Sequence, residues 1–109
     1  MKKFLLPLLL ISITTPIHAM TGKEIYEKTC IACHGANGKG TVPGAANFTD
    51  PNGPISKSDK DLLAHIINGY QTPGSPMAMP ARGGNPALTN EDLKDALKYI
   101  RDTFEPKKK

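Results

Sequence analysis

Two cysteines and a histidine stand close together in the first third of the chain. Cys30 and Cys33 are the only cysteines among the 109 residues, and His34 directly follows the second. Two thiols three positions apart can each add to one vinyl group of a porphyrin, and the adjacent imidazole can then bind the iron. The Cys-x-x-Cys-His spacing therefore predicts a covalently attached haem c with His34 as its axial ligand.

Three other kinds of site also use closely spaced cysteines. A disulfide between Cys30 and Cys33 would suit an oxidising compartment, whereas a thioredoxin-like redox pair expects a βαβ context that this chain lacks. A zinc site needs a second closely spaced pair of ligands, and outside residues 1–19 only His65 is left over. We favour haem, because a chain this short and rich in loops needs a staple and two cysteines cannot form several disulfides.

Two methionines stand together in a proline-rich stretch at residues 75–80. A haem iron that only passes electrons takes a sixth ligand, and a thioether in that position favours the ferrous state. We favour Met79 over Met77, because Pro80 restricts the residue before it to extended backbone. The alternative for both is core filling, the commonest role of a methionine. His65 could replace them in principle, but it lies beside the apolar face of its predicted helix and is expected at the surface or edge.

Three stretches have the pattern of amphipathic helices. The first runs from residue 23 to about residue 30. The second begins at Ser58, where Ser-Asp-Lys-Asp matches a capping box closed by Asp61, and ends at Gly69. The third begins at Thr89, with Asp92 completing a second box, and its apolar residues recur at helical spacing. Because no repeat and no strand-like alternation is present, the predicted fold class is all-α.

Two long loops, residues 35–54 and 70–87, separate these helices. Loops of this length are uncommon in so short a domain unless they carry function. Nine of the ten glycines lie between residues 35 and 84, which suits a chain that turns closely around a flat group. We therefore expect a small domain of three main helices, with long loops wrapped around one covalent haem.

Residues 1–19 have the layout of a secretory signal peptide, with two lysines, an apolar run at residues 4–13 and a polar end. The apolar run is too short to span a bilayer, which needs about 20 residues, although an uncleaved membrane anchor is the alternative. Cleavage after Ala19 would leave a domain at residues 20–109. We therefore expect an exported, periplasmic protein without stable membrane insertion.

Charge indicates little about partners. The 14 basic and 10 acidic side chains nearly balance once the two leader lysines and the three at the C-terminus are set aside. No basic patch or stripe remains in the body of the chain, so the sequence does not predict a nucleic-acid partner.

The chain resembles the class I c-type cytochromes, in particular the small soluble bacterial monohaem type. The resemblance covers essentially the whole of the expected domain and rests on residues 22–26, 30–40, 47–51, 79–84 and 93–101. It implies a one-electron carrier rather than an enzyme, with one haem c and with Met79 as the axial ligand opposite His34.

The same resemblance implies a close crossing of the first and last helices. In that family a glycine and an aromatic residue on the first helix cross an aromatic residue on the last. Gly22, Tyr26 and Tyr99 hold the matching positions, and only glycine permits so close an approach.

The resemblance also implies a loop carbonyl that accepts the second ring N–H of the ligating histidine and so fixes its tautomer. The family usually supplies a proline for this, and both Pro43 and Ala46 are candidates here. The expected partners are membrane or soluble redox complexes that act as electron donor and acceptor to a monomeric carrier. The alternatives are an enzyme or gas sensor with an open sixth position, and a haem subunit fixed within a larger assembly.

Overall fold

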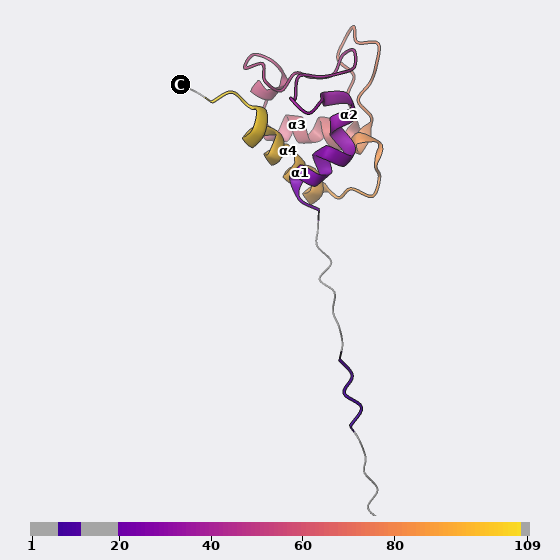
Figure 1. The fold of residues 1–109 in the computed structure, drawn as a ribbon. Coiled ribbons are helices and arrows are strands. Elements are labelled where there is room, and N and C mark those ends of the chain that lie inside the picture. The colour runs from indigo at the N-terminus through magenta and orange to yellow at the C-terminus, as the bar shows by residue number, and fades with distance from the viewer. Residues whose placement is uncertain (1–6, 12–19, 108–109) are drawn as a thin grey trace, which may run out of the picture.

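The computed structural model describes residues 7–11 and 20–107 of the chain (Figure 1). Most of the predicted signal peptide at residues 1–19 lies outside the described residues, and residues 7–11 form neither helix nor strand. Within the described part of the chain, no helix is both long enough and apolar enough to cross a membrane.

The domain is built from helices, as the sequence predicts. In chain order the elements are α1 Gly22–Ile25, η1 Tyr26–Cys30, α2 Ile31–His34, η2 Pro54–Ser56, α3 Asp59–Asn68, η3 Ala81–Gly84 and α4 Asn90–Phe104. The first three follow one another without a break, so with α3 and α4 they make the three main helices (Figure 1). Among the described residues the β structure amounts to one isolated bridge, between Tyr70 and Met79.

The first helical segment begins one residue earlier than predicted. Thr21 Oγ1 accepts a hydrogen bond from the backbone N–H of Glu24 at 3.2 Å, and the Glu24 carboxylate accepts one from the Thr21 N–H at 3.3 Å. This capping box explains the earlier start. The middle turn, Tyr26–Cys30, is π-helical, a geometry that is rare and that often marks functional sites.

The same segment also ends about one turn later than predicted, at His34. Gly35 ends it at φ 82°, in the region that favours glycine. The following loop then folds back, and the backbone N–H groups of Gly40 and Thr41 donate to the carbonyls of His34 and Cys33, both at 2.8 Å. Because these bonds satisfy the last carbonyls of the helix, the whole Cys-x-x-Cys-His motif has a helical backbone.

The second and third helices begin where the sequence predicts. Ser58 Oγ accepts from the Asp61 N–H at 3.2 Å, and Gly69 follows the last residue of α3. The predicted return bond from the Asp61 carboxylate is not formed among the described residues, so only half of that capping box is present. Thr89 and Asp92 form both bonds of theirs.

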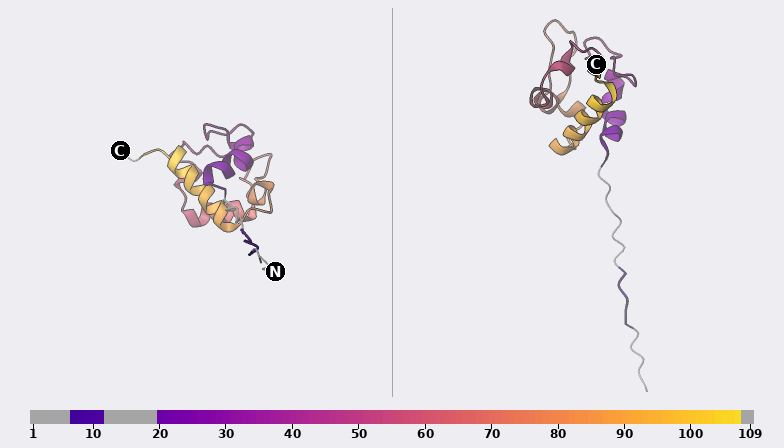
Figure 2. Two further views of the ribbon diagram at one scale, coloured as in Figure 1. Left: turned by 60° about the horizontal axis from the view of Figure 1, so that its bottom comes forward. Right: turned by 90° about the vertical axis from the view of Figure 1, so that its left-hand side faces the viewer.

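The predicted crossing of the first and last helices is confirmed. A Cβ atom placed on Gly22 would lie 2.1 Å from the Asp95 carbonyl oxygen and 3.1 Å from the Cβ of Tyr99. The rings of Tyr26 and Tyr99 pack beside this crossing, with centroids 5.4 Å apart. Figure 2 shows α4 running across the first helical segment at this point.

The core follows the inner face of α4. Its buried side chains form two clusters, one of Ile25, Leu88, Leu93 and Ala96 and one of Tyr26, Ile55 and Ile100. In Figure 1 the first long loop lies along the top of the domain, whereas the second reaches the top and then passes down the right-hand side to the start of α4. The first helical segment and α3 therefore both pack against α4, and the two long loops connect the three helices.

Candidate cofactor site

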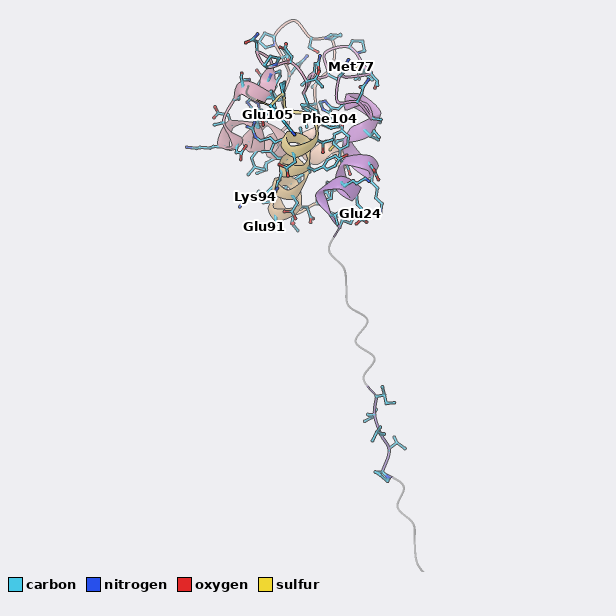
Figure 3. The ribbon with its side chains drawn as sticks, turned by 60° about the vertical axis from the view of Figure 1, so that its left-hand side comes forward. Glu24, Met77, Glu91, Lys94, Phe104 and Glu105 are labelled. Carbon is cyan, nitrogen blue, oxygen red and sulfur yellow. The ribbon has the colours of Figure 1, made fainter. Side chains whose placement is uncertain are left out.

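One cavity brings the predicted site residues together. Cys30, Cys33 and His34 line it from the first helical segment, and Met79 lines it from the second long loop. The remaining walls come from the first loop, α3 and α4, and most of them are apolar. Met77, labelled in Figure 3, lies on the loop side of the molecule, away from the start of α4.

His34 is held with one ring nitrogen toward the protein. Its Nδ1 lies 3.3 Å from the carbonyl oxygen of Ala46, and its ring stacks on Phe48 with centroids 4.5 Å apart. Pro43 lines the cavity, but Ala46 makes the contact, which decides between the two candidates. In the part of the chain that the structure describes, Nε2 has no hydrogen-bond partner.

Burial also sets the protonation state of this histidine. His34 is only 7% exposed, and this burial lowers its pKa below the ordinary value, outweighing the opposing effect of the Ala46 carbonyl. The ring is therefore neutral at pH 7, which is the form that binds a metal. Its end of the helix is fixed by Tyr26, whose buried hydroxyl donates to the Gly35 carbonyl.

Both cysteines are free thiols and half-buried. The alternative of a structural disulfide between Cys30 and Cys33 is therefore not found. Burial, together with the charge of Cys33, raises the pKa of Cys30 to about 11, so this thiol stays protonated at neutral pH. Among the described residues no group of three His, Cys, Asp or Glu side chains is placed to hold a metal ion, as a zinc site would require.

The two methionines differ in how the backbone holds them. Met79 forms the bridge with Tyr70, donating its N–H to the Tyr70 carbonyl at 2.7 Å and accepting from the Tyr70 N–H at 3.1 Å. Its side chain is half-buried. Met77 is 49% exposed, and in the part of the chain that the structure describes its backbone bonds to the side chain of Ser75, two residues before it, at 2.9 and 3.3 Å. Both side chains line the cavity.

His65 lies closer to the cavity than the sequence indicates. It is half-buried and lines the cavity instead of lying on the outer surface, and its ring stacks on Tyr70 with centroids 4.0 Å apart. The cavity-lining face of α3 also includes Leu62 and Ile66, and His65 stands three residues after Leu62. Residues three positions apart share one helix face, so His65 lies on the face of α3 that lines the cavity. The sequence predicts it beside that face.

Tyr70 is a site residue that the sequence analysis missed. It lies under His65 and beside Met79, and the ammonium group of Lys57 lies 5.1 Å from its ring centroid. A tyrosine directly after the glycine that ends a helix carries no strong signal of its own, so only the fold places it.

Comparison with known proteins decides what the cavity holds. The cytochrome c family matches residues 19–104. The chain belongs to this family. Cytochrome c-555 of Prosthecochloris aestuarii is 32% identical over 81 residues, which cover 72% of this chain and 81% of that protein. Cytochrome c-555 of Chlorobaculum thiosulfatiphilum is 34% identical over 85 residues, covering 75% and 92%.

This cytochrome is a monohaem electron carrier, not an enzyme, and its cofactor is a covalently bound haem c with its iron. The residues present fit that group. The cavity offers two free thiols for attachment, a neutral imidazole with an unpartnered nitrogen, and a thioether sulfur on a separate loop. Apolar walls complete a site for a flat, mostly apolar cofactor.

Proposed function

We propose that residues 1–19 export this cytochrome and that the domain at residues 20–109 shuttles single electrons between redox complexes. Cys30 and Cys33 attach the haem, and His34 and Met79 are the two axial ligands of its iron. The observation that supports this ligand set most strongly is that segments almost fifty residues apart contribute these four side chains to one cavity.

The residues of the chain set how the cofactor works. When bound, haem supplies an iron that changes between its ferric and ferrous states by one electron. The Ala46 carbonyl holds His34 in the tautomer that leaves Nε2 for the metal. The thioether of Met79 would hold the iron from the second long loop and would favour its ferrous state.

The rim of the cavity is where a partner would approach. Tyr70 and Met77 line the cavity, and they are also the exposed large apolar side chains of residues 20–107. Residues 40–49 and 62–81 contribute most of the residues that line the cavity, and they contain no Asp, Glu, Lys or Arg. Lys57 and Arg82 line the cavity from outside these segments. The electron donor and acceptor, membrane-bound or soluble, therefore dock on a mostly uncharged face of a monomeric carrier.

One measurement tests export and attachment together. The intact mass of the natively produced protein, measured under denaturing conditions, should equal that of a chain beginning at Met20 plus one haem. Loss of the haem on denaturation would contradict thioether attachment. A mass that includes residues 2–19 would instead support a membrane anchor.

A further inference from the structure

Arg82 has a backbone conformation that residues other than glycine rarely adopt. At φ 55° and ψ 28° it is the one non-glycine residue with positive φ among residues 7–11 and 20–107. A long side chain in this region is strained, and such strain persists only where the surroundings hold the residue in place. Arg82 comes three residues after Met79 and is one of the residues that line the cofactor cavity.

The guanidinium group ties this strained turn to the start of α4. One terminal nitrogen, Nη1, donates to the Leu88 carbonyl at 2.7 Å, and the other, Nη2, donates to Asn90 Oδ1 at 2.7 Å. Leu88 is 3% exposed and belongs to the core, and Asn90 is the first residue of α4. The arginine thus spans from the methionine loop to the most firmly packed helix of the domain.

The turn is also pressed against the helix that carries the cysteines. A Cβ atom on Gly83, which has φ 63°, would lie 2.4 Å from the Cγ2 atom of Thr29, the residue before Cys30. Within the turn, the Gly83 N–H donates to the Pro80 carbonyl at 3.1 Å. Downstream of Met79 the chain is therefore held on two sides, and Met79 itself is held by the bridge to Tyr70.

We propose that Arg82 is a positioning residue for the sixth ligand of the iron. Its two hydrogen bonds to Leu88 and Asn90 clasp the loop after Met79, and they set how often the loop opens and the thioether leaves. This inference rests on the proposed ligation by Met79. The strain indicates the role: glycine would adopt this conformation freely, but it would offer no group to reach α4.

We call the two hydrogen bonds from Arg82 to Leu88 and Asn90 the clasp. The substitution Arg82→Gly separates the effect of the clasp from the effect of the backbone strain. It removes both hydrogen bonds but also relieves the backbone strain, and because these two effects on stability oppose each other, the thermal midpoint of unfolding should change little. In the ferric haem protein, imidazole competes for the sixth position, and its binding rate should saturate at the rate at which Met79 leaves. Stopped-flow absorbance should show a saturating rate at least about tenfold higher in Arg82→Gly, as expected for lost charge-assisted hydrogen bonds.

Two further variants serve as controls. Asn90→Ala removes one of the two acceptors and leaves the Leu88 carbonyl, so its saturating rate should lie between those of the wild type and Arg82→Gly. Arg82→Lys keeps the charge, but its single ammonium cannot reproduce the forked contact, so it should restore the rate only in part.

The possible failures are distinguishable. If imidazole binding to the wild type does not saturate, the iron has no firm sixth ligand, and both the ligation and the clasp are wrong. If the wild type saturates and Arg82→Gly saturates at the same rate, the clasp is wrong and ligation by a methionine stands. A lower thermal midpoint with an unchanged rate would assign Arg82 a purely structural role and overturn the proposal.

Discussion

Met77 and Met79 each carry a thioether and lie two positions apart, but they differ in backbone hydrogen bonding and in exposure. Met79 is paired through both backbone groups with Tyr70, whereas Met77 is half-exposed and bonded only within its own turn. A ligand has to return to the iron after every fluctuation of its loop, so the paired residue is the better anchored of the two.

Met79→Ala should therefore vacate the sixth position. Carbon monoxide should then bind the ferrous form readily, and the reduction potential should fall by an amount on the order of 100 mV, because axial ligands tune haem potentials over about 0.8 V. Redox titration and carbon monoxide difference spectra measure both effects. Met77→Ala is the matched control and should leave both properties nearly unchanged. The reverse behaviour of the two variants would make Met77 the ligand.

At the level of residues, the sequence predicts which side chains bind the haem better than it predicts which residues surround them. Cys30, Cys33 and His34 are recognisable because their spacing is local. The contact of His34 with Ala46 depends on how the first loop folds back, and a carbonyl has no sequence signature. The helical pattern predicts His65 at the surface or edge, beside the apolar face of its helix, whereas the structure has it lining the cavity together with Leu62 and Ile66.

Among the elements, α1 and α4 approach so closely that a Cβ atom on Gly22 would lie 2.1 Å from the Asp95 carbonyl oxygen. Gly22→Ala carries no strain from a positive φ, and alanine is the better helix former, so any loss of stability reports the collision with the Asp95 carbonyl. We expect the free energy of unfolding to fall by about 1–3 kcal/mol or more, as for other overpacked cores. Guanidinium titration followed by circular dichroism measures it.

Gly74→Ala is the matched control for this crossing. Nothing lies within 4 Å of the added carbon, but φ is 85° there, so the substitution should cost only about 1 kcal/mol of backbone strain. Equal losses for the two variants would show that the collision at Gly22 is relieved by a small helix shift.

Element boundaries follow the local signals that the chain provides. Thr89 with Asp92 and the apolar stripe of α4 are strong local patterns, and the structure has the helix there. The π-turn at Tyr26–Cys30 and the continuation to His34 have no such pattern. They depend on the helix crossing and on the carbonyl contacts of the following loop, which are long-range features that a window along the sequence does not contain.

At the scale of the whole molecule, the cavity occupies space that apolar side chains would fill in an ordinary core. No residue of α3 is fully buried, and its apolar face lines the cavity. A domain this small has little other apolar surface to bury, so folding should depend on the haem. Replacing both Cys30 and Cys33 with alanine should give a largely unfolded protein by circular dichroism. A haem-free variant that is helical and unfolds cooperatively would contradict this expectation.

The mostly uncharged surroundings of the cavity predict how electron exchange depends on salt. Oxidation of the reduced protein by hexacyanoferrate(III), a small trivalent anion, should be faster by only about threefold or less at low than at physiological ionic strength, because Lys57 and Arg82 are the charged residues that line the cavity in the described part of the chain. Met77→Lys places a charge on the rim and should make the same reaction clearly faster at low salt. A steep salt dependence in the wild type would show that charges elsewhere on the molecule guide the approach.

A potentiometric titration of the purified protein, followed by its visible spectrum, is the most direct test of the central claim. That claim is that this protein is an electron carrier whose iron has no position open to small molecules. We predict one reversible, one-electron transition of a single haem, and a reduced spectrum that does not change when carbon monoxide is added. A reduced spectrum that shifts at once under carbon monoxide would show an open sixth position. That result would contradict the carrier function and support a gas-binding protein.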